Sequence, residues 1–556
     1  MSAIAPVDQL RLALHKAGRF TRRLRLGAVS GPLGRFRTAR GSRSQLLIAP
    51  PDLRTADPTI ATEIYGGRFA FAGHVVEAGG KSPFDIGPPS EDWLRELHSF
   101  GWLRHLRAAD TPLARKNARV VVEDWLALHR RPTGEEVWDT QVTARRVLSF
   151  LAQSPLILHD ADHDLYRDFV RSLLRHSSVL RSAIGSSEPG LPRIHAAIAI
   201  ALIGLSLSQQ ERLAKSGLDR VDTELLAQVL PDGGHISRNP SAIVEILVDL
   251  LPLRQALIAR GLVPSETLLH AIERMMPMLR FYRHGDGAFA HFNGVASSAS
   301  SLVATVISYD ESLGTPAASA SYSGYERVEG GDSVLLVETG SPPPIAYSSE
   351  AHAGTLSFEF SRGTQRIIIN CGAPAARHKH LRRAARRSAA HSTVILNEES
   401  SSRFSSPAVD AHIISGPRQV VARRHNPNDG SIVLQTSHDG YVRRFGLVHE
   451  RNFRISTDGR LLEGVDRFVG AAQNLNFAVR FHLHNAVGVH STDRRTAVDL
   501  RLTDGSVWRF EANSPVEVEE SVHLSDVFGS RPSSQLVLAG NTRSEVPVKW
   551  RLTLMS

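Results

Sequence analysis

The spacing of apolar residues changes once along this 556-residue chain, and that change limits the folds it can adopt. From about residue 90 to 310, segments such as "TARRVLSFLAQSPLIL" and "LYRDFVRSLLRHSSVL" place apolar residues at three- and four-residue steps, which is typical of amphipathic helices. After a small, polar stretch near Ala317, short runs such as "SVLLVE" and "VKWRLTL" alternate apolar and polar residues. Helices without strands between them predict stacked helical hairpins, as a bundle, solenoid or closed toroid. The alternating runs predict an antiparallel β-sandwich.

The length of the chain also exceeds what one core usually holds. We therefore predict an α+β multidomain protein with three parts. Residues 1–90 are a mixed helical and extended segment, residues 91–316 are the helical domain, and residues 317–556 are the β-domain.

The charge balance favours anionic partners. Lys and Arg number 65 against 56 Asp and Glu, a formal net charge of +9. Nucleic acid, acidic lipid and acidic polysaccharide all fit this balance. Few aromatic residues interleave with the basic runs, so we expect no nucleic-acid partner.

No segment resembles a membrane span or a secretory signal. The longest apolar run, Ala196 to Leu207, is shorter than the ~20 residues that cross a bilayer. The first 27 residues hold no continuous apolar stretch and no small-residue cleavage site. They fit a basic amphipathic helix or a solvated terminal helix.

The single cysteine, Cys371, excludes an intrachain disulfide and a CxxC metal cluster. It follows an apolar run, which predicts a buried and inert thiol.

Several motifs occur in an order that resembles the heparinase II/III family of polysaccharide lyases. They are "WLRELHSFGWLRHL", "LPDGGHISRNP", "FYRHGDGAFAHFNG", "AHAGTLSFEFSRGTQRIIINCG" and "RRSAAHSTVIL". The resemblance implies an (α/α) toroid over residues 91–316 followed by an antiparallel β-sandwich. It also implies cleavage of a uronate-containing acidic polysaccharide by β-elimination, with no cofactor required. That reaction needs a group that neutralises the uronate carboxylate, a base for the C5 proton, and an acid, tyrosine or histidine, for the leaving oxygen.

The loop "PDGGHISRNP" supplies three candidates. By resemblance His235 is catalytic, and Arg238 and Asn239 bind the acidic sugar. Asn239 has an alternative role as the N-cap of the helix that follows. The family's acidic residue after this histidine and its Tyr-His pair beyond the proline are absent here.

The segment "FYRHGDGAFAHFNG" supplies two more. Tyr282 is a candidate catalytic acid or base if a neighbouring arginine lowers its pKa, and His284 is expected to position substrate. The alternative for Tyr282 is that it continues the apolar face of the preceding helix into the core.

In better-known family members a His-x-His-x-Asp stretch precedes a strand, the first His acting in chemistry and the second in a structural zinc site. Here the same places hold Glu350, His352 and Gly354. We predict a catalytic role for Glu350. His352, Asn370 and His391 are the implied zinc ligands, or alternatively a hydrogen-bonded cluster, because an amide oxygen binds zinc less well than a carboxylate.

The densest basic run, "RHKHLRRAARR", ends at Arg386 and Arg387. Arg386 is expected to bind the acidic substrate, although such runs are often solvated loops.

Three functions therefore compete. The first is a lyase acting on an anionic glycan. The second is a non-catalytic or altered glycan-binding protein of cell-envelope or exopolysaccharide metabolism, which the departures at Glu350, Gly354 and Asn370 favour. The third, a nucleic-acid binder, rests on charge alone. The resemblance implies the cell envelope or periplasm, with the cytoplasm as the alternative because no signal is recognised.

Overall fold

A computed structural model describes residues 44–132, 136–295, 300–310, 314–375, 378–406, 411–471, 474–525, 529–544 and 546–555. The expected helix at the start of the chain lies outside these residues. The chain divides into two compact units, each described here by itself. The helical unit holds residues 1–228 and 244–273, and the β unit holds residues 229–243 and 274–556.

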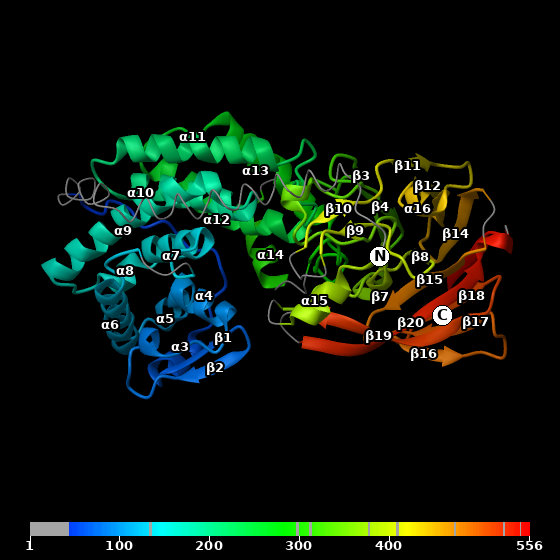
Figure 1. Ribbon diagram of the computed structural model, residues 1–556, viewed down its shortest axis with the longest axis horizontal. Helices are drawn as coiled ribbons and strands as arrows, with labels where there is room; N and C mark the ends of the chain where they lie inside the picture. The colour runs from blue at the N-terminus through cyan, green and yellow to red at the C-terminus, as the bar shows by residue number, and fades with distance from the viewer. Residues whose placement is uncertain are drawn as a thin grey trace. The chain divides into compact units, whose positions relative to one another are not determined.

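The helical unit is built from helices joined by short loops, with one small hairpin (Figure 1). Its elements are α3 (Pro58–Tyr65), β1 (Arg68–Phe71), β2 (His74–Glu77), α4 (Glu91–Ser99), α5 (Leu103–Ala109), α6 (Pro112–Leu128), α7 (Thr140–Ala152), α8 (Ser154–Ile157), α9 (His163–Ala183), α10 (Leu191–Ser206) and α11 (Glu211–Gln228). Helices α12 (Pro240–Ala259) and α13 (Glu266–Phe281) each have residues in both units.

Helices α10 and α11 show why this part of the sequence folds into hairpins. A Cβ on Gly204 of α10 would lie 2.2 Å from the backbone nitrogen of Ala214, and one on Gly217 of α11 would lie 2.4 Å from that of Ala201. Only glycine at these two positions lets the helices approach so closely. The apolar stripe of α10 is buried along nearly its whole length, so the predicted helical packing is confirmed.

The β unit contains two large antiparallel sheets. Its strands are β3 (Ser319–Ala320), β4 (Tyr325–Gly330), β5 (Ser333–Glu338), β6 (Phe358–Arg362), β7 (Gln365–Ile369), β8 (Val394–Leu396), β9 (Arg403–Phe404), β10 (Ile413–Ser415), β11 (Val420–His425), β12 (Ile432–His438), β13 (Leu447–Ile455), β14 (Leu461–Gly470), β15 (Asn476–Leu483), β16 (Gly488–Ser491), β17 (Ala497–Arg501), β18 (Val507–Ala512), β19 (Glu517–Ser525), β20 (Gly529–Asn541) and β21 (Val548–Leu554). It also contains the helices α14 (Ser300–Ile307), α15 (Lys379–Ala385) and α16 (Val442–Phe445).

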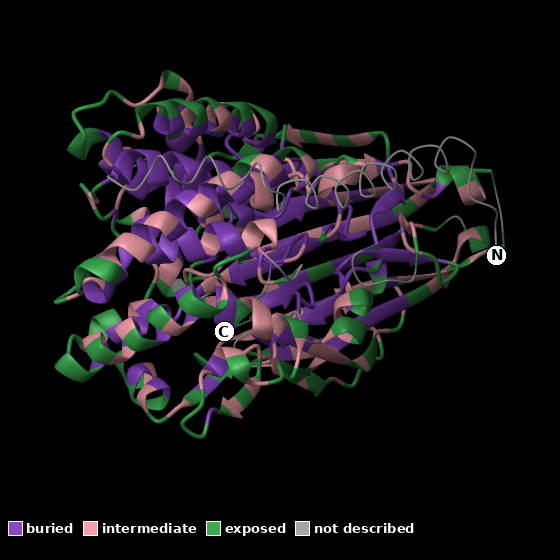
Figure 2. Ribbon diagram, turned by 60° about the vertical axis from the view of Figure 1, so that its left-hand side comes forward, coloured by how far each residue is buried: buried purple, intermediate pink, exposed green. Residues whose placement is uncertain are grey.

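The strand order defines the two layers. In the part of the chain that the structure describes, one sheet runs β11-β12-β13-β14-β21-β18-β17-β16, and the other runs β19-β20-β15-β7-β6-β5-β4-β3 with β8 beside β15. Apolar side chains from both sheets meet in one core, where Phe358 of the second sheet stacks on Trp550 of the first at 5.5 Å between ring centroids. Figure 2 shows the strand interiors buried and the ends of the elements exposed. The predicted antiparallel β-sandwich is confirmed.

The compact units divide the chain differently from the sequence-based boundary at residue 316. The loop of residues 229–243 and the chain from Arg274 onward belong to the β unit. Consequently every residue predicted for the site lies in the β unit.

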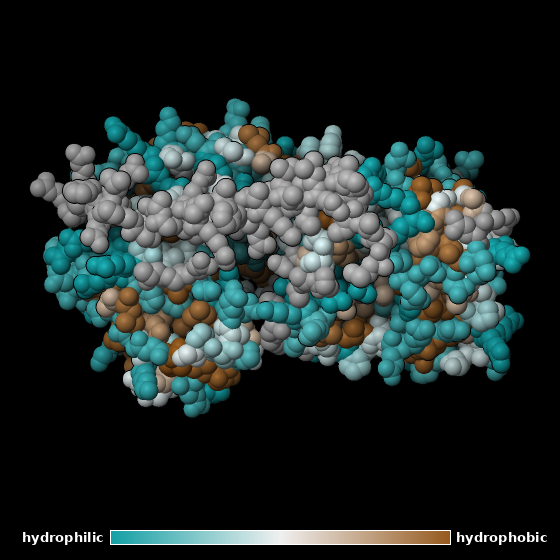
Figure 3. Space-filling model, viewed as in Figure 1, coloured by the Kyte–Doolittle hydropathy of each residue, from teal (hydrophilic) through white to brown (hydrophobic). Residues whose placement is uncertain are grey.

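Two smaller predictions also have outcomes. Within the described residues, no helix is long and apolar enough to cross a membrane, and hydrophilic side chains predominate on the face shown in Figure 3. Cys371 is buried, and burial raises the pKa of its thiol to about 12. The predicted burial of the thiol is therefore confirmed, and a raised pKa disfavours the reactive thiolate.

Candidate functional site

An exposed carboxylate, Glu350, forms the centre of the candidate site. It lies in the connection between β5 and β6, and its side chain is 51% exposed. The amide nitrogen of Asn239 donates to its Oε2 at 3.2 Å, and a guanidinium nitrogen of Arg382 on α15 lies 3.5 Å from its Oε1. We call Asn239, Glu350 and Arg382 the rim site. It brings a carboxylate, an amide and a cation together, with Asn239 6% exposed and the carboxylate facing solvent.

The local fold explains why Asn239 points toward Glu350. Its side-chain oxygen accepts from the backbone nitrogen of Ser241 at 2.9 Å, which makes Asn239 the N-cap of α12. The amide nitrogen is then left facing Glu350. Gly294, with φ +93°, permits this approach, because a Cβ there would lie 3.2 Å from the backbone oxygen of Glu350. Asn239 therefore serves as the helix cap and as a group at the candidate site.

Arg386 lies beneath the rim site. It is 5% exposed, and its guanidinium donates to the backbone oxygens of Ala351 and Ser348, each at 2.9 Å. Its Cζ lies 4.7 Å from the ring centroid of Phe404. The structure thus corrects the expectation of a substrate-facing arginine: Arg386 holds the segment that carries Glu350. Its neighbours Arg383 and Arg387 are exposed.

Arg238 is likewise used within the fold. It is 5% exposed and donates to the backbone oxygens of Ser323 and Gly324 at 2.8 and 3.0 Å, and also to that of Ser341. Its guanidinium lies 3.3 Å from Glu338. Most of its hydrogen-bonding capacity therefore fastens the loop of residues 229–243 to the β-strands.

His352 and His391 form a direct pair below the rim site. The Nδ1 of His352 lies 3.0 Å from the Nε2 of His391, and the Nδ1 of His391 lies 2.8 Å from the backbone oxygen of Arg387. Burial lowers the pKa of both rings, to about 4 for His391 and well below the ordinary value for His352. Both imidazoles are therefore neutral at pH 7, and one ring donates an N–H that the other accepts.

Asn370, the third implied zinc ligand, is turned to another partner. Its side-chain oxygen accepts from the backbone nitrogen of Ser392 at 2.9 Å, and the described residues supply no partner for its buried amide nitrogen. Across the described residues, no three side chains of His, Cys, Asp or Glu are placed to hold a metal ion. The contacts present are those of a hydrogen-bonded cluster, and a zinc site at these residues stays a prediction.

Asn293 connects the histidine pair to the β-strands, and no sequence pattern pointed to it. Its side-chain oxygen accepts from the backbone nitrogen of His352 at 3.0 Å. Its amide nitrogen donates to Tyr325 at 2.7 Å and to Glu338 at 3.0 Å. Its φ of +47° is a conformation that asparagine tolerates better than most residues. A single buried amide thus orients the backbone at His352.

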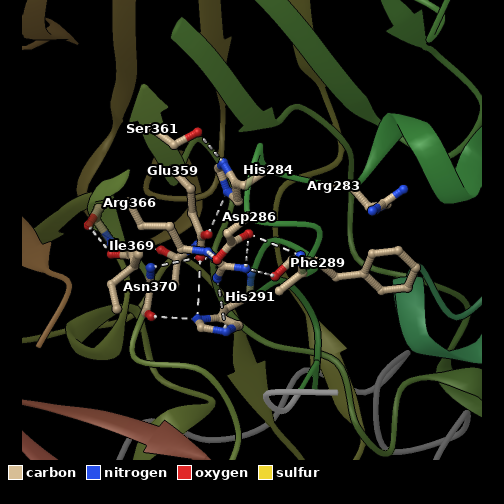
Figure 4. A network of polar contacts seen from close by, with 12 residues as sticks. Arg283, His284, Asp286, Phe289, His291, Glu359, Ser361, Arg366, Ile369 and Asn370 are labelled. Carbon is tan, nitrogen blue, oxygen red and sulfur yellow. Dashed lines mark hydrogen bonds and ion pairs between the residues drawn. The ribbon is translucent and has the colours of Figure 1, made fainter. Parts of the chain in front are cut away.

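His284 belongs to a second cluster, which is fully buried (Figure 4). Its Nε2 lies 3.0 Å from Glu359 and its Nδ1 2.7 Å from Ser361. Burial, and then Arg366, lower the pKa of His284 well below the ordinary value. The structure corrects the expectation that His284 contacts substrate, because β6 and β7 cover it.

Glu359 is the acceptor at the centre of this cluster. It also accepts from the backbone nitrogens of His291 at 2.8 Å and Asn370 at 2.9 Å. Arg366 reaches the cluster from β7 and pairs with Asp286 at 2.9 Å. We call His284, His291, Glu359, Arg366 and Asn370 the buried network. It joins the loop after α13 to the centre of the nine-stranded sheet.

Tyr282 lies in an aromatic core rather than beside a cation. It is 1% exposed and packs edge-on against Phe281 and Tyr325, with ring centroids 5.2 and 5.1 Å away. Burial raises the pKa of its hydroxyl well above the ordinary value, and Tyr325 and Asp232 add to this. The expectation of a lowered pKa is therefore wrong, and the alternative of a core residue describes its position.

His235 is 3% exposed, and its Nδ1 lies 2.7 Å from the hydroxyl of Ser237. Its catalytic role stays a prediction. Of the ten residues predicted for the site, Glu350 is the one that the described structure leaves substantially exposed.

The site can now be compared with known proteins. Residues 313–551 match the family model described as "Heparinase II/III-like, C-terminal". The chain is also 31% identical over 548 residues to "FtsZ-localized protein C" of Caulobacter vibrioides, covering 94% of this chain and 92% of that protein.

Solved structures of lyases share the fold. Heparinase III superposes with a TM-score of 0.66 at 14% identity, covering 87% of this chain and 79% of that one. A mutant of the heparan sulfate lyase HepC of Pedobacter heparinus gives a TM-score of 0.62 at 14% identity, covering 94% and 88%. These likenesses confirm the predicted architecture of an (α/α) toroid followed by a β-sandwich.

Proposed function

Because the chain belongs to the heparinase II/III-like family, we propose that it acts on an anionic, uronate-containing glycan by β-elimination. The observation that carries this proposal is the 3.2 Å contact between Asn239 and the exposed carboxylate of Glu350. It joins a potential base to a hydrogen-bond donor, which are two of the groups that the reaction requires.

In this proposal Glu350 transfers the proton. Its carboxylate takes the hydrogen from C5 of the uronate, and the electron pair of that bond forms the C4–C5 double bond. The C4–O bond breaks, and the glycosidic oxygen leaves with the proton returned from Glu350. Asn239 and Arg382 stabilise the negative charge that develops on the uronate carboxylate. Tyr282 takes no part, because its hydroxyl is buried.

A second candidate is a non-catalytic protein that binds the same class of glycan in the cell envelope. The burial of Tyr282 and His284 favours it, since neither offers a proton to a leaving group. The relative's name ties that protein to FtsZ, which supports a role for this chain at the division site. The fold and the net positive charge of the chain are as compatible with glycan binding as with glycan cleavage.

One assay separates the two candidates. The purified full-length protein is incubated with heparan sulfate, chondroitin sulfate, alginate and bacterial exopolysaccharide, and the ultraviolet absorbance of a 4,5-unsaturated uronate is followed. A lyase gives product with at least one polymer. Glu350→Gln abolishes that product, while Glu520→Gln, at an exposed position on β19, leaves it unchanged.

Two outcomes oppose the lyase proposal. Binding of a polymer without any unsaturated product supports the second candidate. Equal product from wild type and Glu350→Gln contradicts the role of Glu350.

A further inference from the structure

The β unit contains a cavity of about 530 Å³ apart from the rim site. Residues 321–324, 339–341 and 418–421 line it, together with the side chain of Arg238. These segments precede β4, follow β5 and enter β11; the labels of β4 and β11 lie near each other in Figure 1. A cavity of this size falls in the range of small-molecule sites, about 300 to 1,000 Å³.

The floor of the cavity is backbone and guanidinium. A Cβ on Gly340 would lie 2.6 Å from the Cζ of Arg238, and one on Gly324 would lie 2.4 Å from the Cα of Gly340. Glycine at both positions therefore lets these two segments and the guanidinium pack closely beneath the cavity. Arg238 is held in place by backbone oxygens and pairs with Glu338 at 3.3 Å, so it shapes the floor while its charge is offset by that carboxylate.

The walls carry two groups that the fold does not use. Tyr322 is 66% exposed. Arg418 is exposed, and the described residues supply its guanidinium with no hydrogen bond or ion pair, although its backbone nitrogen donates to Asp439 at 2.7 Å. Ser321, Ser341 and Gln419 also line the cavity.

We propose that this cavity is a second glycan site that holds one or two acidic sugar residues. The sugar carboxylate pairs with Arg418. The apolar face of the ring lies on Tyr322, whose side chain offers an aromatic surface with a polar tip. Sugar hydroxyls meet Ser321, Ser341 and Gln419.

This site goes beyond the cleavage proposed above, because it requires no reaction. It is linked to the rim site through the backbone, since Arg238 lines the cavity and Asn239, the next residue, contacts Glu350. An occupied cavity steadies the segment that orients Asn239.

An extended peptide is the competing occupant. Strand β11 lies at the edge of its sheet, and sheet edges accept added strands. The exposed aromatic ring beside an unpaired cation favours the sugar, because a strand added to the edge needs neither.

The test is calorimetric titration of the full-length protein at low salt with trigalacturonate, maltotriose as the neutral sugar, and an acidic peptide. Trigalacturonate is expected to bind, and Arg418→Gln and Tyr322→Ala to weaken that binding by at least about fivefold each. Tyr322→Phe keeps the ring and stays within about twofold. Arg423→Gln replaces an exposed arginine on β11 outside the cavity, and this matched control also stays within about twofold.

The results separate this site from the proposed reaction. If Arg418→Gln loses one of the trigalacturonate binding events seen with the wild-type protein, the result supports the cavity as a glycan site even if no polymer is cleaved. Three outcomes overturn the proposal: equal affinity in Arg418→Gln and Arg423→Gln, equal binding of maltotriose, or tighter binding of the acidic peptide.

Discussion

The rim site and the buried network contain the same kinds of side chain but occupy opposite environments. At the rim, Glu350 is half exposed and has one amide and one guanidinium nearby. In the buried network, Glu359 has no exposure and accepts from a histidine and two backbone nitrogens. A buried carboxylate whose two oxygens both accept hydrogen bonds fixes a fold, whereas one that faces solvent can meet a ligand.

This difference in exposure divides the residues predicted from the sequence into candidates for ligand contact and residues that hold the fold. Glu350 and Asn239 remain candidates for contact with a glycan. Arg386 and the His352–His391 pair position the segment around Glu350, and His284 and Asn370 hold the sheet. Function therefore has to be sought at the rim and stability in the network.

Removing the central carboxylate of each region should give the largest contrast. Glu359→Ala leaves buried donors without an acceptor, so we expect the free energy of unfolding to fall by about 3 to 5 kcal/mol. Glu350→Ala is the matched variant and should cost less than about 1 kcal/mol, because water replaces its contacts. Urea unfolding of both variants measures this, and equal losses would break the distinction.

Lowering the pH should sharpen the distinction between the exposed rim site and the buried side chains. The pKa of His391 is about 4 in the folded protein, against an ordinary value of about 6.5 in the unfolded chain. The unfolded state therefore binds the proton more tightly between these values. The contribution of His391 to the free energy of unfolding is fully present above pH 6.5. It falls by about 1.4 kcal/mol per pH unit down to pH 4.

The variant His391→Gln measures how much of that loss of stability is due to His391. His391→Gln lacks the titrating group, so the difference in stability from wild type should narrow as the pH falls from 6.5 to 4. His425→Gln, at an exposed position on β11, is the control, and its difference should stay constant. If the His391→Gln difference is the same at every pH, the ring is not held neutral by the fold.

Arg386 gives an intermediate case. Arg386→Gln removes the cation that donates to Ser348 and Ala351, at a cost of about 2 kcal/mol. Amide exchange of residues 348–352 should accelerate with it. Arg387→Gln, the exposed neighbour, should change stability by less than about 0.5 kcal/mol. Matching exchange in the two variants would show that Arg386 does not hold the segment.

The smallest expected effect concerns metal. Since His352 and His391 bond each other directly, chelation should leave the melting temperature unchanged, and elemental analysis should find no stoichiometric zinc. One zinc per chain together with a lower melting temperature after chelation would instead place His352, Asn370 and His391 around a metal.

Periodicity alone predicted much of the fold. Strand β5 coincides with the run "SVLLVE", and α9 contains the whole predicted helical segment "LYRDFVRSLLRHSSVL". Helices α10 and α11 are separated by a short turn in which Gln209 adopts a left-handed conformation, φ +60°. The spacing of apolar residues predicts the helices and strands, but it does not reveal a tight turn between two helices.

The site was less predictable, because burial of polar groups depends on distant contacts. Ser357 precedes β6, and together with Glu359 and Ser361 in that strand it alternates with apolar residues, which suggests a solvated face. The strand lies inside its sheet and the loop after α13 covers that face, so all three are buried. Glu359 and Asn293 were missed for this reason, and Tyr282 was assigned a role that its aromatic surroundings exclude.

Carboxyl footprinting of the full-length native protein tests the central distinction most directly. With a carbodiimide and an amine, followed by mass spectrometry, Glu350 should be labelled at a rate close to that of the exposed Glu520, and Glu359 only after unfolding. Labelling of Glu359 in the native protein at the rate of Glu350 would contradict the division into an accessible rim and a buried network.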